Sequence, residues 1–239
     1  MNKREILTKL KKTILGNLKM NNKIKTLLNI DDPRMNSSRL MNHYHLVTQV
    51  LEYGVEGDVV ELGTCDGLST RVIAAVMEWQ KSEKNLHLFD SFQGLPEFSQ
   101  EDRPNHPYLR EGVDHPWAKP GMFAVSPDTL LSNLSLFDLL GTKIVVPGWF
   151  EDTVPNELPE KICFAHLDGD LYESIKTSIE GVYPRLSKGA ICVIDDYNFP
   201  AFPGAKKAVD EFLEDKPEII NDLYVKPLRG SVHAYFRKK

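Results

Sequence analysis

From residue 58 onward, short apolar runs alternate with longer stretches in which apolar residues recur at helical spacing. Short apolar runs bounded by turn residues are typical of strands that are buried on both faces. We predict strands at Asp58–Leu62, Leu86–Asp90, Lys143–Pro147, Ile162–Asp168 and Ala190–Asp195. We predict helices at Leu68–Gln80, Pro127–Leu139, Tyr172–Leu186 and Ala205–Glu214. This order predicts an α/β domain with a mostly parallel sheet and helices on both faces.

Two segments depart from that pattern. Asp222–Lys226 and Ser231–Arg237 alternate around a Pro-Leu-Arg-Gly turn, which predicts a C-terminal antiparallel hairpin and a sheet of about seven strands. Residues 97–122 are rich in proline, histidine and charge and have no sustained period. Such a long loop in a compact domain is usually a lid, a substrate wall or disordered. We therefore predict one domain over residues 41–239 with a long loop at 97–122.

Residues 1–40 are predicted to form a basic helical extension. The first 30 residues carry eight Lys and Arg against Glu5 alone, although the whole chain has a net charge of −5. Leu7, Leu10, Ile14 and Leu18 recur at helical spacing within this segment. Three uses compete for an amphipathic helix of this kind: packing on its own domain or on a sister subunit, contact with an anionic membrane surface, and a mobile tail. We favour packing and expect a homo-oligomer.

Composition narrows the classes of function. The acidic net charge makes no general case for nucleic-acid binding, and no apolar run is long enough for a transmembrane helix. The three cysteines lack the spacing of a zinc site and two of them lie in predicted strands. This predicts buried thiols and a reducing, cytoplasmic location.

Two aspartate clusters follow predicted strands, namely Asp168-Gly169-Asp170 and Asp195-Asp196. If the strands are parallel neighbours, these carboxylates gather at one edge of the sheet. Like charges about 4 Å apart repel by roughly 4 kcal/mol per pair at an effective dielectric near 20, so the cluster calls for a cation. Oxygen ligands favour Mg²⁺, Mn²⁺ or Ca²⁺.

The first predicted strand runs through Glu61 into the loop Gly63-Thr64-Cys65-Asp66-Gly67 and then a helix, where open α/β sheets bind nucleosides. Cys65 occupies the position where a dinucleotide fold needs a glycine near the pyrophosphate. Glu61 and Asp66 add negative charge, which suits the sulfonium and ammonium groups of S-adenosylmethionine. Asp90, at the end of the second strand, is placed to accept hydrogen bonds from ribose hydroxyls. Alternatively, Glu61 and Asp90 only cap the turns that follow them.

Longer stretches of this sequence resemble the macrocin O-methyltransferase family of magnesium-dependent enzymes that methylate sugar hydroxyls in antibiotics. The matching stretches are Asp90-Ser91-Phe92-Gln93-Gly94-Leu95-Pro96, Pro147-Gly148-Trp149-Phe150-Glu151-Asp152-Thr153-Val154-Pro155, Leu167-Asp168-Gly169-Asp170-Leu171-Tyr172-Glu173-Ser174, Ile194-Asp195-Asp196-Tyr197 and Ala205-Lys206-Lys207-Ala208-Val209. They cover most of residues 40–215 in the family's order. The resemblance is weaker in the lysine-rich segment before Asp31 and in the loop at 97–122.

The resemblance implies a Rossmann-like class I methyltransferase fold. It also implies that Asp168, Asp195 and Asp196 are metal ligands and that Asp170 is the catalytic base. Our candidates for the S-adenosylmethionine site are Glu61, Gly63, Thr64, Ser69, Asp90, Ser91 and Ser126.

Some of these residues have structural explanations as well. Asp170-x-x-Glu173 before a helix fits an N-cap with a capping box, and Ser126 before Pro127 has the form of an N-cap. Asp195 and Asp196 could be ordinary turn residues. Strand alternation places His166 on the same face as Asp168, so it is a candidate second base, although a packed, hydrogen-bonded histidine is the better explanation.

Our leading hypothesis is a metal-dependent O-methyltransferase that acts on a hydroxyl of a sugar or glycosylated small molecule. One alternative is methylation of a catechol or similar phenol. Another is a non-catalytic cofactor-binding partner in polysaccharide or natural-product assembly. A nicotinamide oxidoreductase is disfavoured by Cys65 and by the acidic first turn.

Overall fold

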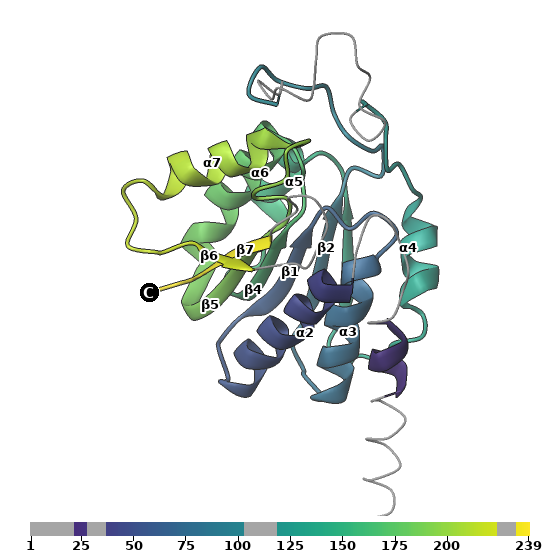
Figure 1. Cartoon of the computed structure of the whole chain (residues 1–239). Helices are drawn as coiled ribbons and strands as arrows, with labels where there is room; N and C mark the ends of the chain where they lie inside the picture. Colours follow the sequence, from purple (N-terminus) through teal and green to yellow (C-terminus); the bar gives the residue numbers. More distant parts are fainter. Residues whose placement is uncertain (1–21, 28–36, 103–118, 224–232) are drawn as a thin grey trace, which may run out of the picture.

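The computed structural model describes residues 22–27, 37–102, 119–223 and 233–239, which form one α/β unit (Figure 1). Seven strands form a single sheet in the order β3-β2-β1-β4-β5-β7-β6. Helices α2 and α3 pack together on one face and α3 also contacts α4, whereas α5, α6 and α7 pack together on the other (Figure 1). The predicted doubly covered sheet is confirmed.

Five neighbouring strands are parallel, with β3 at one edge of the sheet. They are β1 (Asp58–Leu62), β2 (Leu86–Asp90), β3 (Lys143–Pro147), β4 (Ile162–Leu167) and β5 (Leu186–Ile194). At the other edge, β7 (His233–Arg237) pairs antiparallel with β5, and β6 (Asn221–Leu223) pairs antiparallel with β7. The predicted hairpin is therefore present, and its predicted turn lies outside the described residues. Strand β5 begins earlier than predicted, at Leu186.

The helices are α2 (Ser37–Glu52), α3 (Leu68–Trp79), α4 (Pro127–Leu134), α5 (Phe150–Glu157), α6 (Tyr172–Val182) and α7 (Pro203–Leu213). Sequence periodicity did not predict α2 or α5, and it extended α4 and α6 too far. Helix α6 passes into a short 3₁₀ turn at Tyr183–Arg185, because Pro184 has no backbone N–H to continue the α-helical ladder.

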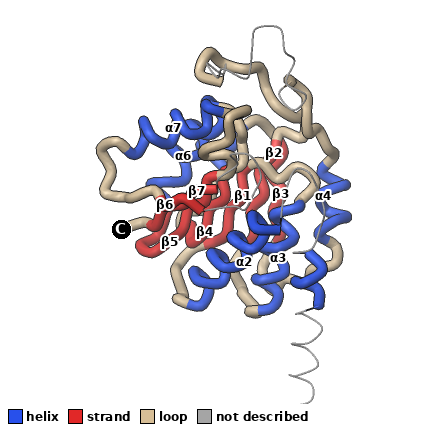
Figure 2. The backbone as a smooth tube through the Cα atoms, viewed as in Figure 1, coloured by secondary structure: helices blue, strands red, loops and turns tan. Residues whose placement is uncertain are grey.

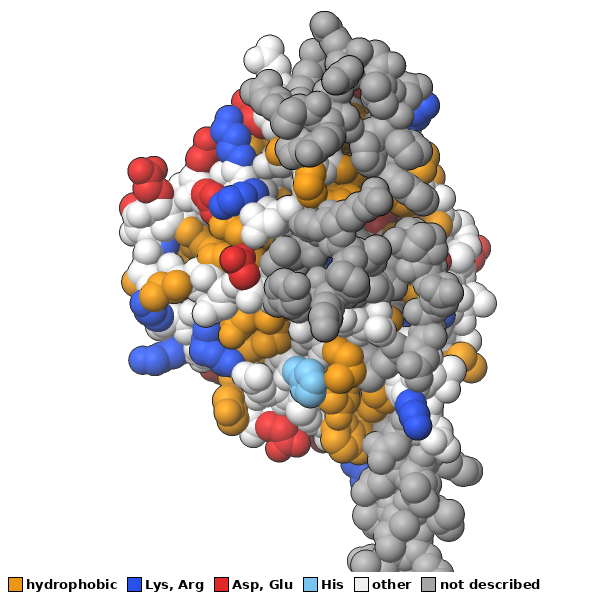
Figure 3. All heavy atoms as spheres, in the orientation of Figure 1, with side chains coloured by type: hydrophobic (Ala, Val, Ile, Leu, Met, Phe, Trp, Pro, Cys, Tyr) orange, Lys and Arg blue, Asp and Glu red, His pale blue; other side chains and the backbone are white. Residues whose placement is uncertain are grey.

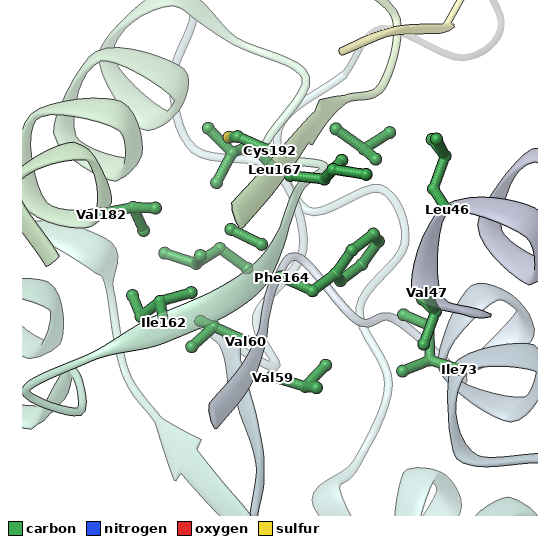
Figure 4. Close-up of a cluster of buried hydrophobic side chains, with 14 of the residues drawn as sticks. Leu46, Val47, Val59, Val60, Ile73, Ile162, Phe164, Leu167, Val182 and Cys192 are labelled. Atoms are coloured by element: carbon green, nitrogen blue, oxygen red, sulfur yellow. The ribbon is translucent and has the colours of Figure 1, made fainter. Parts of the chain in front are cut away.

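The main core lies on both faces of the sheet. All six residues of β4 are buried, and Figure 4 shows Val59 and Phe164 directed toward α2 and α3, whereas Val60 and Ile162 point toward α6. The strands therefore read as continuous apolar runs because both of their faces are covered. The free thiols of Cys163 and Cys192 are buried in this core, as predicted, and burial raises the pKa of Cys163 to about 12.

Part of the predicted N-terminal extension is described. Residues 22–27 are helical, and Ile24 and Leu27 are buried in the main core. The Lys23 Nζ atom donates to Glu78 Oε2 at 2.6 Å and to the Leu136 carbonyl at 2.7 Å. This part of the extension thus packs on its own domain. The predicted helix around Leu7–Leu18 lies outside the described residues.

Among the described residues, no helix combines the length and apolar character that crossing a membrane requires.

Candidate active site at the carboxyl edge of the sheet

The carboxyl ends of four neighbouring strands bring the candidate residues together. The parallel register pairs Leu62 of β1 with Phe89 of β2 and with Leu167 of β4, and Leu167 in turn with Ile194 of β5. The residues that follow these positions therefore meet at one edge, namely Gly63, Asp90, Asp168 and Asp195. Figure 2 shows the loops above the strands on this side. The predicted convergence of the two aspartate clusters is confirmed by this register.

Backbone strain is concentrated at the same edge. Six non-glycine residues of the described chain have positive φ, and four of them follow β1, β2, β4 and β5: Cys65 (φ 45°), Phe92 (56°), Asp170 (59°) and Asp196 (39°). Such conformations cost free energy and persist where the surrounding structure enforces them, often at functional sites.

The loop after β1, residues 63–67 and hereafter the glycine loop, contacts the carboxyl ends of β2 and β4. Gly63 has φ +89°, and a Cβ atom there would lie 1.9 Å from the Asp168 carbonyl oxygen, so the close approach requires glycine. Asp90 Oδ2 accepts from the backbone N–H groups of Thr64 at 2.9 Å and Cys65 at 2.8 Å. Its Oδ1 accepts from Phe92 N at 2.7 Å. Asp90 thus caps the turn that follows it, as the capping alternative predicted, and it also fixes the glycine loop after β1, which was not predicted. Ribose contact by Asp90 stays a prediction.

Glu61 lies beneath this loop rather than in it. Its side chain is fully buried; Oε1 accepts from the Ser69 hydroxyl at 2.5 Å and Oε2 from the Thr70 hydroxyl at 2.5 Å. His166 Nδ1 lies 2.9 Å from Oε1. Burial raises the pKa of Glu61. The Glu61 carboxylate therefore anchors the start of α3 through Ser69 and Thr70. Cofactor contact by Glu61 or Ser69 stays a prediction.

The other two serines predicted for the cofactor site, Ser91 and Ser126, make hydrogen bonds within turns. Ser91 Oγ donates to the Gly94 carbonyl at 3.1 Å. Ser126 Oγ accepts from Thr129 N at 3.2 Å at the start of α4, which confirms the predicted N-cap. Cofactor contact by either serine stays a prediction.

The aspartates form a compact group of ligand atoms. Asp168, Asp170 and Asp196, hereafter the carboxylate group, each offer an oxygen within 4.8 Å of the others. A second set, His166, Asp168 and Asp195, meets the same limit. The predicted ligands Asp168, Asp195 and Asp196 are thus divided between two sets that share Asp168. Arg39 contacts Asp195 and also lies 3.3 Å from Asp196 Oδ1. The assignment of Asp168, Asp195 and Asp196 as joint metal ligands stays a prediction.

Burial and nearby carboxylates raise the pKa values of Asp168 and Asp170. Burial and the neighbouring Asp196 raise the pKa of Asp168 well above its usual value, and burial followed by Asp196 and Asp168 does the same for Asp170. Charged carboxylates this close need a proton or a cation between them. An oxygen-only donor set of this kind fits a hard divalent cation.

The alternative reading of Asp170 as a helix cap is not supported. Helix α6 begins at Tyr172, its N-cap residue is Leu171, and that residue makes no side-chain cap hydrogen bond. The Tyr172 N–H instead donates to Asp102 Oδ1 at 2.7 Å. Asp170 occupies the centre of a tight turn, in which Leu171 N donates to the Gly169 carbonyl at 2.5 Å. Its carboxylate is therefore available to the carboxylate group.

His166 is poorly suited to be a second base. The ring is fully buried, and burial followed by the Arg39 charge lowers its pKa to about 3. A histidine with such a low pKa is neutral at physiological pH and is a weak proton acceptor. The packed, hydrogen-bonded explanation therefore fits the structure better.

Sequence reasoning missed the basic residues behind the aspartates. Arg39 and His43 come from α2 and His233 from β7, and all three are buried. Arg39 contacts Asp195 and lies 3.3 Å from Asp196 Oδ1, and its Nε donates to His233 Nε2 at 2.7 Å. A signal did exist, because Arg39 and His43 share the helical face of Leu40, Leu46, Val47 and Val50.

The sequence of the chain is similar to those of known O-methyltransferases. The sequence profile of macrocin-O-methyltransferase (TylF) matches residues 19–233. The chain is 34% identical to mycinamicin III 3''-O-methyltransferase of Micromonospora griseorubida, over 73% of this chain and 67% of the relative. It is 35% identical to 8-demethyl-8-(2,3-dimethoxy-alpha-L-rhamnosyl)-tetracenomycin-C 4'-O-methyltransferase of Streptomyces olivaceus, over 73% of this chain and 64% of that relative.

Solved structures show the same fold. The O-methyltransferase NovP superposes with a TM-score of 0.74 at 22% identity, over 93% of this chain and 99% of that one. The calicheamicin methyltransferase CalS11 gives a TM-score of 0.64 at 25% identity, over 92% and 91% of the two chains. With the class I O-methyltransferase fold, the glycine loop and the aspartates at one sheet edge, the chain belongs to the macrocin-O-methyltransferase family.

Proposed function

We propose that this protein is a divalent-metal-dependent O-methyltransferase that moves a methyl group from S-adenosylmethionine to a hydroxyl of a sugar or sugar-bearing small molecule. One observation carries the proposal. The glycine loop lies directly beside the carboxylate group, because Gly63 packs against the backbone of Asp168. This arrangement provides adjacent places for a nucleoside cofactor and for an acceptor hydroxyl beside a base.

The residues have separate tasks in this proposal. S-adenosylmethionine, when bound, supplies a methyl group on a positively charged sulfur, and a divalent cation supplies charge that balances the carboxylates. Asp168 and Asp196 are the ligands on which the metal proposal rests, because the family resemblance and the structure both include them. Asp195 offers a ligand atom near Asp168 and His166, and its Oδ2 pairs with Arg39. Asp170 accepts the proton of the acceptor hydroxyl, and the remaining contribution of the chain is alignment.

Cofactor binding is the first test. In calorimetry we expect S-adenosylhomocysteine to bind the wild-type chain and NAD to give no heat. Ligand at 100 times its Kd should stabilise the fold by about 2.7 kcal/mol, which a thermal-shift assay detects. Absence of binding at millimolar S-adenosylhomocysteine would refute the proposed function.

Metal dependence is tested separately. We expect chelation to abolish methyl transfer, added Mg²⁺ to restore it, and Asp168→Asn and Asp196→Asn to weaken metal binding strongly. Because the pKa values of Asp168 and Asp170 are raised, metal affinity should increase with pH as protons leave these groups. Calorimetric metal titrations at two pH values measure this. Full activity in the presence of a chelator would contradict the metal requirement.

The acceptor class is supported by the relatives' names, one of which includes a rhamnosyl group. A screen that compares glycosides with catechols and simple phenols separates the sugar hypothesis from phenol methylation. Turnover of phenols alone would replace the sugar assignment, and cofactor binding without turnover of any acceptor would favour a non-catalytic partner. Homo-oligomerisation and a cytoplasmic location stay predictions.

A further inference from the structure

Asp102 is a buried carboxylate in the loop between β2 and α4, far in sequence from the aspartate clusters. Only 2% of the residue is exposed. Its Oδ1 accepts from Tyr172 N at 2.7 Å, and its Oδ2 accepts from Ser99 N at 3.0 Å and from Ser99 Oγ at 2.6 Å. The first bond satisfies the leading N–H of α6, so Asp102 supplies the cap that the preceding residue, Leu171, does not.

Three segments meet tightly at this carboxylate. A Cβ atom on Gly204, at the start of α7, would lie 2.0 Å from Asp102 Oδ1 and 2.8 Å from Tyr172 N. Beside Asp102, Glu101 pairs with Lys207 of α7 at 3.7 Å. Acidic and basic side chains lie close together on the upper left of Figure 3. The loop is thus joined to the starts of both α6 and α7.

A small apolar cluster supports the same junction. Its buried members are Leu95, Leu171, Ala201 and Phe202, and four partly buried residues pack against them: Phe98, Met122, Phe123 and Phe199. The cluster joins both described sides of the loop to Leu171, the neighbour of Asp170. The described parts of the loop are therefore packed against the residue that follows Asp170.

Asp170 would otherwise be a natural cap for α6. Aspartate is a preferred N-cap residue, Glu173 stands three residues after it, and the positive end of the helix dipole attracts a carboxylate. In the structure Asp170 instead keeps its left-handed conformation at φ 59° and contributes an oxygen to the carboxylate group. The cap from Asp102 removes the competing use of the Asp170 side chain.

We propose that Asp102 is a positioning residue: by capping α6 from the loop, it holds the Asp168–Asp170 turn so that the Asp170 carboxylate stays in the carboxylate group. The proposal rests on the proposed function, because it assigns Asp170 a task that needs this placement. In this proposal, Asp102 of the loop between β2 and α4 helps to align the base, Asp170.

The test compares Asp102→Ala and Asp102→Asn with the neighbouring control Glu101→Ala, which removes the surface ion pair and leaves the Tyr172 bond. We expect Asp102→Ala to lower kcat about 100-fold, the effect typical of a misplaced reacting group. Asp102→Asn, whose amide oxygen can still accept from Tyr172 N, should lose less, and Glu101→Ala should stay within about twofold. The Kd of S-adenosylhomocysteine should stay within about twofold in all three variants.

Two further measurements separate positioning from general damage. Hydrogen exchange at the start of α6 should accelerate in Asp102→Ala but not in Glu101→Ala. In an Asp170→Asn background, Asp102→Ala should cost less than about threefold in kcat, because a residue that acts through Asp170 has nothing left to position. If Asp102→Ala does not fold, the same measurements on Asp102→Asn decide the question.

Two results would overturn the positioning role. One is a kcat loss in Asp102→Ala no larger than that in Glu101→Ala. The other is an equal kcat loss from Asp102→Ala in the wild-type and the Asp170→Asn backgrounds. Failure of the proposed function has a different signature, namely a wild-type chain that binds no S-adenosylhomocysteine. The exchange measurements on α6 would still show whether Asp102 holds the turn.

Discussion

Asp170→Asn is expected to lower kcat by about 10²–10⁴-fold, the range that a positioned general base contributes. The substitution removes the proton acceptor and preserves the size of the side chain. Asparagine also tolerates the left-handed backbone conformation that Asp170 adopts at φ 59°. Initial rates of methyl transfer at saturating acceptor and S-adenosylmethionine measure the loss.

The same variant distinguishes the base from a helix cap. Asparagine is as good an N-cap residue as aspartate, so a pure capping role predicts a normal melting temperature and normal kcat. A base predicts a normal melting temperature with a large loss of kcat. Glu173→Gln is the matched control, because it changes the other carboxylate of the predicted capping box, and it should leave kcat within about twofold. Activity of Asp170→Asn within tenfold of wild type would exclude the base assignment.

Gly63→Ala is expected to abolish measurable S-adenosylhomocysteine binding and to destabilise the fold by several kcal/mol. The left-handed conformation at φ +89° costs a residue with a Cβ atom about 1–2 kcal/mol. The larger effect is steric, since the new Cβ would lie 1.9 Å from the Asp168 carbonyl oxygen and must push the glycine loop away from β4. Calorimetry and thermal unfolding report the two losses.

Gly54→Ala is the matched control for this prediction. Gly54 has a similar left-handed conformation, at φ +63°, but nothing lies within 4 Å of an added Cβ. The control therefore incurs the conformational cost without the clash, and its cofactor affinity should equal that of wild type. Equal behaviour of the two variants would show that the contact between the glycine loop and the Asp168 backbone has no role in binding.

Local pattern was sufficient for most of the sheet. Strands β1, β2 and β4 are buried along almost their whole length, so the sequence displays them directly as short apolar runs. The edge strand β3 is mostly half-buried, and its run of Ile144, Val145 and Val146 was still sufficient to predict it. Helix α2 was missed because its buried face mixes Arg39 and His43 with leucine and valine. Helix α5 was missed because it is short, contains Pro155 and lies between a glycine and another proline.

For the site as well, the sequence predicted some features and could not reveal others. The chain's order of strands and turns was enough to place Asp90, Asp168, Asp170, Asp195 and Asp196 at one edge. This order could not reveal how those carboxylates are grouped. The grouping involves Arg39 of α2, which contacts Asp195 and lies 157 positions before Asp196 in the chain. Nor could the order show that Glu61 is enclosed by Ser69, Thr70 and His166, since these bonds join separate elements.

By itself, therefore, the sequence determined the α/β class, the carboxyl-edge location and the chemical type of the site, because strand burial and side-chain identity are local properties. Only the tertiary structure decided which carboxylates form the carboxylate group, that Arg39 lies beside Asp195 and Asp196, and that Asp102 rather than Asp170 caps α6. Those outcomes depend on contacts between residues distant in the chain, such as Asp102 and Tyr172. Burial makes each such pairing exclusive, because a buried polar group must bond to the partner that packing places beside it.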